Sequence, residues 1–354
     1  MWRFGFMAKD KEEKLNYKQE LQKLKAEGPR TLYLLWGKED YLREQYLSQL
    51  KSFCIPEGEN GFNYKRFDGP ELSANAFREA VDALPFLADR TFVELRDIDL
   101  NKLKEAQEIL SVISELPDYC TVCFVQNAEY EPDGRLKLVR AIRDKGCELK
   151  FTQQGQGALI DWIARRFAAH GKRIDFEASQ RLIFISGDLM NRLIPEIEKI
   201  AAYVKDEKVT VRDVEAVAHH IPEAQVFELT DLLAQKQYSA SMNTLSELLA
   251  ENEYDPIYLL AVLGSQMRRL YCARLAIEHD LGAKYVSECC GIKYPFMVTK
   301  LLQSARGFTR QQLKDAVRVC AETDMQMKSS GGDSRELLKN AVLAIATEAS
   351  DAKR

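Results

Sequence analysis

Short apolar runs alternate with amphipathic stretches over the first 150 residues of the chain. The runs predict strands, and the stretches between them carry apolar side chains at helical spacing. The predicted strands are Thr31–Trp36, Tyr64–Phe67, Thr91–Leu95, Thr121–Val125 and Glu148–Phe151. The predicted helices are Asp10–Glu27, Tyr41–Phe53, Ala74–Ala83, Lys102–Leu116 and Arg135–Lys145. Such alternation predicts a parallel sheet with helices on both faces.

The strand pattern stops near residue 153, where Gln153–Gly157 has two glycines, lacks an apolar anchor and is typical of a hinge. Helical patterns follow at Ala158–Ala169, Phe176–Ser186 and Leu189–Lys205. Thr210 with Asp213 matches a capping box and predicts the start of a fourth, short helix. Residues 153–221 are therefore expected to form a small helical domain.

From Pro222 onward the pattern is helical again. Asp255 before Pro256 predicts a helix start, and that helix is expected to run to about Asp280 with Gly282 as its stop. Thr309 and Gln312 form a second capping box, and a final helix is expected over Arg335–Ala349. The predicted fold is α/β plus all-α, with an α/β domain at 1–152, a small helical domain at 153–221 and a larger helical domain at 222–354.

Composition narrows the class of protein. The 354 residues are 46% hydrophobic and 29% charged, which excludes a disordered or fibrous chain. The apolar runs are all shorter than the ~18 residues of a membrane helix, and the first residues carry too many acids for a signal peptide. A cytoplasmic location is expected, and Met7 is an alternative start. The net charge of −4 lacks the basic excess of a protein that grips many phosphates, so any DNA contact is expected to be local or shared with partners.

One pair of the eight cysteines, Cys120 and Cys123, has a spacing seen in metal sites. The pair falls in an apolar run that predicts a buried strand, where residues i and i+3 point to opposite faces and cannot hold one ion. Reduced structural thiols are expected here, with no metal. The four histidines lack a partnered nucleophile and are also expected to be structural.

A sheet domain followed by a small helical domain suggests a nucleotide-binding ATPase, yet the phosphate loop is missing. The junction after the first strand reads Trp36-Gly-Lys-Glu-Asp-Tyr-Leu42, with one glycine and no hydroxyl residue after Lys38. Glu39 and Asp40 would repel phosphates. The sequence therefore predicts no ATP hydrolysis at this site, no catalytic residue and no cofactor. Arg96–Asp99 and Gln126–Asn127 are either remnants of an ATPase site or ordinary polar strand ends, and the second interpretation is preferred.

The arrangement resembles the delta-subunit family of the bacterial DNA polymerase III clamp loader, over roughly residues 30 to 345. The order and spacing of several stretches carry this resemblance more than any one of them. They are Leu34-Leu-Trp-Gly-Lys-Glu-Asp-Tyr-Leu42, Ala83-Leu-Pro-Phe-Leu-Ala-Asp-Arg90, Gly187–Ile200, Val226–Leu233, Asp255–Leu260 and Asp324–Ser330. A Ser-Arg-Cys motif, carried by the delta-prime and ATPase subunits of the loader, does not occur in the sequence, which favours delta.

The resemblance implies an AAA+-like module without a working ATP site, a helical lid domain and a C-terminal helical collar that joins a pentameric loader. It implies a non-catalytic subunit that binds the sliding clamp (beta) and opens one of its interfaces during DNA replication. The implied partners are the clamp, the gamma/tau ATPase subunits, delta-prime and primer-template DNA within the complex. The DNA-directed DNA polymerase (nucleotidyltransferase) activity would belong to the whole holoenzyme.

The same resemblance places the clamp-binding hydrophobic pair at Phe86 and Leu87, flanked by Leu84 and Pro85. Here the order is Phe-Leu after a proline, where the family often has Leu-Phe, so the deeper of the two side chains is not fixed. An apolar pair between a helix and a strand is usually core. The charges at Asp89 and Arg90 and the rigid proline instead predict an exposed apolar tip.

Two other functions remain open from the residues alone: a true AAA+ ATPase, and a scaffold of the replication complex without a clamp contact. Contact of the collar with DNA is a further open point. Tyr271 and Tyr285 lie in the sequence near several basic residues and would suit stacking on a base, although packing within a collar helix is preferred.

Overall fold

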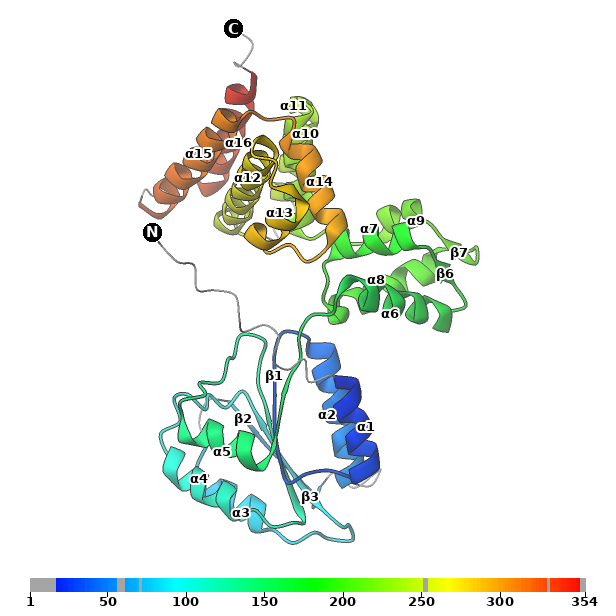
Figure 1. The fold of residues 1–354 in the computed structure, drawn as a ribbon, viewed down its shortest axis with the longest axis vertical. Helices are drawn as coiled ribbons and strands as arrows, with labels where there is room; N and C mark the ends of the chain where they lie inside the picture. The colour runs from blue at the N-terminus through cyan, green and yellow to red at the C-terminus, as the bar shows by residue number, and fades with distance from the viewer. Residues whose placement is uncertain (1–16, 56–60, 70–71, 251–253, 330–331, 351–354) are drawn as a thin grey trace. The chain divides into compact units, whose positions relative to one another are not determined.

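The computed structural model describes residues 17–55, 61–69, 72–250, 254–329 and 332–350 (Figure 1). The predicted helix start at Asp10 and the alternative start at Met7 lie outside these residues. The chain divides into two compact units. The N-terminal unit is Met1–Gln153 with Leu189–Asn191, and the C-terminal unit is Gln154–Asp188 with Arg192–Arg354. The further division at residue 221 stays a prediction, because lid and collar helices fall in one unit.

The N-terminal unit is built on a five-stranded parallel sheet, as predicted. Its strands are β1 (Leu32–Trp36), β2 (Tyr64–Asp68), β3 (Thr91–Arg96), β4 (Cys120–Val125) and β5 (Cys147–Lys150). Their order across the sheet is β2-β3-β4-β1-β5, and every neighbouring pair is parallel. The carboxyl ends of all five strands therefore lie at one edge of the sheet and the amino ends at the other.

Helices cover both faces of this sheet (Figure 1). One face carries α1 (Tyr17–Glu27) and α2 (Asp40–Cys54), and the other carries α3 (Ala74–Asp82), α4 (Ala106–Ser114) and α5 (Lys137–Lys145). Alternate residues of the strands point toward α3, α4 and α5 and close an apolar core with Phe77, Ile109 and Val139. This three-layer arrangement is the α/β, AAA+-like part of the fold.

The C-terminal unit begins with a group of four helices. They are α6 (Gln156–Ala169), α7 (Phe176–Ser186), α8 (Met190–Tyr203) and α9 (Val211–Val217). Two short strands that the sequence pattern missed, β6 (Arg173–Ile174) and β7 (Lys208–Val209), pair in parallel beside them. Two-residue strands are too short to show an alternation of apolar and polar residues, so the sequence carried no signal for them.

The remaining helices of this unit pack around α12, the longest of them. The group comprises α10 (Pro222–Ala234), α11 (Tyr238–Ala250), α12 (Pro256–Glu278), α13 (Gly282–Cys290), α14 (Pro295–Ala305), α15 (Arg310–Ser329) and α16 (Ser334–Ser350). One side of α12 supplies Leu259, Leu263, Met267 and Leu270 to the shared core. The first helical group is attached to this one through α7 and α10, where the Phe184 and Phe227 rings meet edge to face at 5.1 Å.

Local signals in the C-terminal unit were mostly predicted correctly. Thr210 and Asp213 exchange the two bonds of a capping box, Thr309 and Gln312 do the same, and Asp255 accepts a hydrogen bond from the Ile257 N–H. The predicted end of α12 at about Asp280 is correct to within two residues, because the helix ends at Glu278. The role predicted for Gly282 was wrong, because this residue begins α13 instead of stopping α12.

Candidate functional site

The turn between β1 and α2 stands where an ATPase of this architecture would hold phosphates, at the carboxyl edge of the sheet. Gly37 has a φ of 117°, and a Cβ atom there would lie 2.4 Å from the carbonyl oxygen of Phe151. The Phe151 N–H donates to the Trp36 carbonyl at 2.7 Å, and the Phe151 carbonyl accepts from the Glu39 N–H at 3.1 Å. The backbone groups of this turn are therefore bonded to the segment after β5.

Charged side chains also occupy the turn. The buried Arg43 guanidinium donates to the Gly37 carbonyl at 2.7 Å and pairs with the Asp40 carboxylate at 2.7 Å. Glu39 is fully buried. The sequence predicted that Glu39 and Asp40 exclude phosphate by repulsion. The geometry adds a different reason, because Arg43 balances Asp40 and fills the turn itself.

The polar residues after β3 and β4, considered as ATPase remnants, hold the local backbone. Asp99 accepts from the Asn101 N–H at 3.0 Å, and Asn127 accepts from the Glu129 N–H at 3.1 Å. The buried Gln126 side chain donates to the Ile98 carbonyl at 2.8 Å. These bonds support the interpretation of ordinary polar strand ends.

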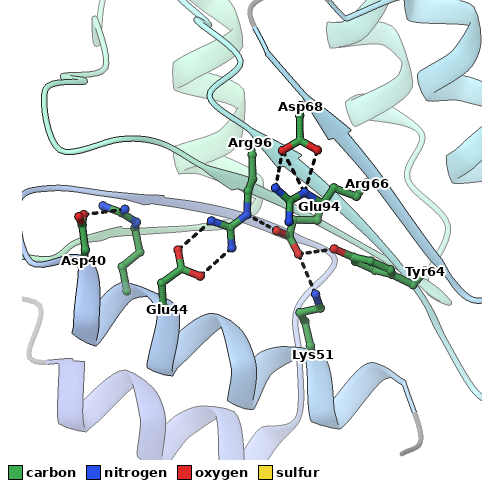
Figure 2. A network of polar contacts seen from close by, with 9 residues as sticks. Asp40, Glu44, Lys51, Tyr64, Arg66, Asp68, Glu94 and Arg96 are labelled. Atoms are coloured by element: carbon green, nitrogen blue, oxygen red, sulfur yellow. Dashed lines mark hydrogen bonds and ion pairs between the residues drawn. The ribbon is translucent and has the colours of Figure 1, made fainter. Parts of the chain in front are cut away.

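A buried ionic network lies between α2 and the strands β2 and β3 (Figure 2). Glu94, fully buried in the middle of β3, accepts from the Lys51 ammonium at 2.9 Å and from the Tyr64 hydroxyl at 2.9 Å. It also accepts from Arg96, which in turn makes a bidentate pair with Glu44 at 2.9 and 2.6 Å. The network ties α2 to the edge of the sheet.

Two opposed effects act on the Glu94 carboxyl. Burial raises its pKa, because a charged carboxylate loses its hydration. Hydrogen bonds from Arg96 and Lys51 outweigh that effect and hold the pKa below its ordinary value. The bidentate bond with Glu44 raises the pKa of Arg96. Glu94 and Arg96 therefore both stay ionised at neutral pH. All groups of this network are matched in charge and hydrogen bonding, which is typical of a structural cluster.

The 83–90 loop, between α3 and β3, lies at the amino edge of the sheet. It contains the predicted site residues, and the structure brings three large apolar side chains to its surface. Leu84 is 76% exposed, Phe86 55% and Leu87 79%, with Pro85 half-buried between them. Leu87 has a φ of 53°, a left-handed conformation that branched residues rarely adopt. The loop therefore presents apolar groups to solvent on a constrained backbone, and the predicted exposure of this segment is observed.

A second loop joins this surface, and the sequence pattern did not predict it. Phe62, two residues before β2, is 82% exposed, and its ring centroid lies 5.3 Å from that of Phe86. The buried Asn63 side chain accepts from the Phe86 N–H and donates to the Phe86 carbonyl, both at 2.7 Å. A contact between residues 23 positions apart depends on the pairing of β2 with β3, which local sequence patterns do not reveal.

The two cysteines with metal-like spacing lie inside the sheet. Cys120 and Cys123 are both fully buried in β4, and all eight cysteines are free thiols. Burial raises the pKa of Cys120 to about 11, so its thiol stays protonated and unreactive at neutral pH. Among the described ranges, no group of three or more His, Cys, Asp or Glu side chains is placed to hold a metal ion. No helix in the described part of the chain is both long and apolar enough to cross a membrane.

Both units match one protein family by sequence. Residues 33–152 match the family described as "DNA polymerase III, delta subunit", and residues 223–345 match "DNA polymerase III delta subunit, C-terminal domain". The chain is 24% identical over 322 residues to "DNA polymerase III subunit delta" of Bacillus subtilis, covering 89% of this chain and 92% of that protein. It is 22% identical over 319 residues to "Probable DNA polymerase III subunit delta" of Aquifex aeolicus, covering 87% and 89%.

The fold is also similar to that of a solved structure. The Bacillus subtilis DNA clamp loader delta protein superposes with a TM-score of 0.56 at 22% sequence identity. The alignment covers 94% of this chain and 99% of that protein. The likeness therefore extends over both units, including the AAA+-like sheet and the helical C-terminal unit.

Proposed function

The chain belongs to the DNA polymerase III delta subunit family, and from that premise we propose that it is a clamp-loader subunit that binds the sliding clamp and opens or holds open its interface during DNA replication. The 83–90 loop would make the contact. The observation that carries this proposal is the exposure of Leu84, Phe86 and Leu87 on one short loop. Apolar side chains gathered in this way are typical of a protein-binding surface.

The size of these side chains fits an anchoring role. Burying a side chain as large as Phe or Leu is favourable by ~1.5–3 kcal/mol, so Phe86 and Leu87 together would contribute roughly 3–6 kcal/mol before ordering costs. The backbone of Phe86 is already held by Asn63, which limits the entropy lost on binding. The similar solved structure from Bacillus subtilis is named a DNA clamp loader delta protein, which supports a clamp-loader role for this chain.

Within this proposal the C-terminal unit joins the other loader subunits. Its partners would be the gamma/tau ATPase subunits and delta-prime, with primer-template DNA reached inside the assembled complex in the cytoplasm. The net charge of −4 supports a DNA contact that is shared with partners over one made by this chain alone. Any DNA-directed DNA polymerase activity would be that of the holoenzyme.

Titration of the organism's own sliding clamp onto the full chain tests the clamp contact. Phe86→Ala with Leu87→Ala is expected to weaken the dissociation constant roughly 150-fold, which corresponds to about 3 kcal/mol. Because both side chains are exposed, the melting temperature should change by only about a few degrees. The matched control is Phe176→Ala with Tyr203→Ala, which removes two side chains that are 61% and 60% exposed elsewhere. A stable double variant that binds the clamp like the parent would contradict the proposal.

We also expect the chain to lack an ATP-driven step of its own. The Arg43 guanidinium and the bonded backbone of Phe151 occupy the turn that would have to cradle phosphates. Calorimetry with Mg-ATP should give no heat of binding, while an ATPase subunit of the same loader serves as the positive control. A dissociation constant in the low micromolar range would favour the AAA+ ATPase alternative.

A further inference from the structure

Phe62 and Phe86 form an aromatic pair on the surface although they come from different loops. Their rings are tilted by 48° at a centroid distance of 5.3 Å, within the range of favourable ring contacts. Phe62 is the most exposed of the large hydrophobic side chains in the described part of the chain. These two exposed aromatic rings enlarge the apolar surface that the 83–90 loop presents. They extend it toward β2, the outermost strand of the sheet.

The side chain next to Phe62 holds this surface in place. The Asn63 carboxamide bonds both the N–H and the carbonyl of Phe86, as a neighbouring strand would. Asn63 is itself fixed, because its carbonyl accepts from the Phe92 N–H at 2.8 Å where β2 and β3 pair. Its side chain is almost completely buried, so these two bonds form away from competing water.

The bonds made by Asn63 fall directly before the constrained residue of the loop. Leu87 keeps its left-handed backbone only if the surrounding structure holds it. Asn63 fixes both peptide groups that flank the Cα atom of Phe86, so it defines the path of the chain into Leu87. The apolar side chains are thus displayed by a loop whose backbone is held from β2.

We propose that Phe62 is a contact residue for the sliding clamp and that Asn63 is the positioning residue for Phe86 and Leu87. Phe62, Phe86 and Leu87 would present a preformed apolar surface to an apolar pocket on the clamp. The inference rests on the proposed function. Preorganisation of this kind raises affinity because less conformational freedom is lost on binding.

Clamp titration with single variants of the full chain tests both assignments. Phe62→Ala is expected to weaken clamp binding about tenfold, since a well-placed interface side chain contributes more than about 1 kcal/mol. Asn63→Ala should weaken binding by about the same factor without removing an apolar contact. Phe176→Ala, which removes an exposed aromatic ring elsewhere in the chain, should bind like the parent. The inference is overturned if the parent binds the clamp, the Phe86→Ala and Leu87→Ala variant does not, and Phe62→Ala and Asn63→Ala both bind normally.

Two measurements distinguish a positioning role of Asn63 from a general role in folding. Amide hydrogen exchange at Phe86 should become at least about tenfold faster in Asn63→Ala, while the amides of the β2–β3 pair stay protected. In a double-mutant cycle with Leu87→Ala, the losses of clamp affinity should be less than additive, because Asn63 acts through the loop. Uniform loss of protection across β2 and β3, or additive losses, would contradict the positioning role.

Asn63→Asp serves if the alanine variant fails to fold. It retains the size of the side chain and an acceptor for the Phe86 N–H but loses the donor to the Phe86 carbonyl. A loss of affinity is again expected, but the Phe86 amide should exchange more slowly than in Asn63→Ala, because its N–H keeps an acceptor. Failure of the parent to bind the clamp would instead remove the proposed function, so the two failures are distinguishable.

Discussion

The loops at the two edges of the sheet in the N-terminal unit differ in how their side chains are arranged. At the carboxyl edge, the turn after β1 is closed by backbone bonds to Phe151 and by the buried Arg43. At the amino edge, the 83–90 loop and Phe62 leave large apolar side chains in water. The edge that carries nucleotide chemistry in an ATPase is filled here, and the opposite edge carries the surface suited to a partner.

Under the proposed function, this difference means that one edge of a sheet can serve binding while the opposite edge is filled by the protein's own groups. The core of β1, β3 and β4 needs only apolar side chains of suitable volume, so it does not depend on a phosphate site. The loops at the two edges lie at opposite ends of strands that are about 17–20 Å long. The expected consequence is that each edge can be disturbed with little effect on the other.

The largest effect on stability is expected from Gly37→Ala, in the turn at the carboxyl edge of the sheet. An alanine there would combine a left-handed backbone with a Cβ atom 2.4 Å from the Phe151 carbonyl oxygen. We expect the free energy of unfolding to fall by about 3 kcal/mol, from backbone strain and overpacking together. Urea denaturation measures this change, and the folded variant should still bind the clamp within about twofold of the parent.

Gly28→Ala is the matched control for that variant. Gly28 also has a positive φ, of 79°, but a Cβ atom there would meet nothing within 4 Å. Only the backbone strain remains, so a loss of about 1 kcal/mol is expected. If both alanine variants lose the same free energy of unfolding, then the close approach of Phe151 to Gly37 does not constrain the turn.

A smaller effect is expected from Glu94→Gln, which lies in β3 between the two edges. The substitution keeps the shape of the side chain but leaves Lys51 and Arg96 without their shared carboxylate. Breaking a fully buried pair costs about 3–5 kcal/mol, and the partial exposure of both cations reduces the expected loss to about 2 kcal/mol. Asp68→Asn breaks an exposed pair with Arg66 in the same region, and should change stability by less than about 0.5 kcal/mol.

The sign of the pH dependence follows from the lowered pKa of Glu94. A carboxyl whose pKa is lower in the folded state stabilises the fold above its unfolded pKa and loses that contribution as the pH falls through the folded value. The ordinary value is 4.5, so the stability difference between the parent and Glu94→Gln should be constant above that pH and shrink below it. Denaturation at a series of pH values measures it, and a difference that grows on acidification would contradict the assignment.

The sequence predicted the sheet well because its signals are local. All five predicted strands are present, with ends that differ by one residue. The central strands β1, β3 and β4 are buried and mostly apolar, which is a local signal. The role of Gly282 was predicted wrongly because a glycine is compatible with both the stop of one helix and the start of the next. Asp280 has a left-handed φ of 51° and makes the break before Gly282.

The candidate site was predicted only in part, for a different physical reason. The charges and the proline around Phe86 and Leu87 indicated exposure, and both side chains are exposed. Asn63 and Phe62 reach the same surface through the pairing of β2 with β3, and no spacing in the sequence encodes that contact. Glu94 did carry a signal, a charged residue within an apolar strand, but its partners come from α2 and β2 and cannot be read from the strand alone.

The smallest effect on stability is expected at the amino edge of the sheet, in a comparison of Leu87→Gly with Leu87→Ala. Both variants remove the same exposed side chain, so both should weaken clamp binding by a similar factor. They differ in the backbone, because alanine keeps the strain at a φ of 53° and glycine relieves it. Glycine also has more freedom in the unfolded chain, which offsets part of this gain.

The net expectation is that Leu87→Gly is more stable than Leu87→Ala by about 0.5–1 kcal/mol. Paired urea denaturation curves resolve a difference of this size, and equal slopes would show that the unfolded states are comparable. Such a result would mean that the parent has a strained leucine in the 83–90 loop although a glycine would adopt the same backbone conformation without strain. Strain retained where the side chain makes no contribution to the core would support the proposed role of Leu87 in binding. If Leu87→Ala is instead the more stable variant, the loop does not impose the left-handed conformation on Leu87. The 83–90 loop is then less preorganised than the bonds from Asn63 indicate.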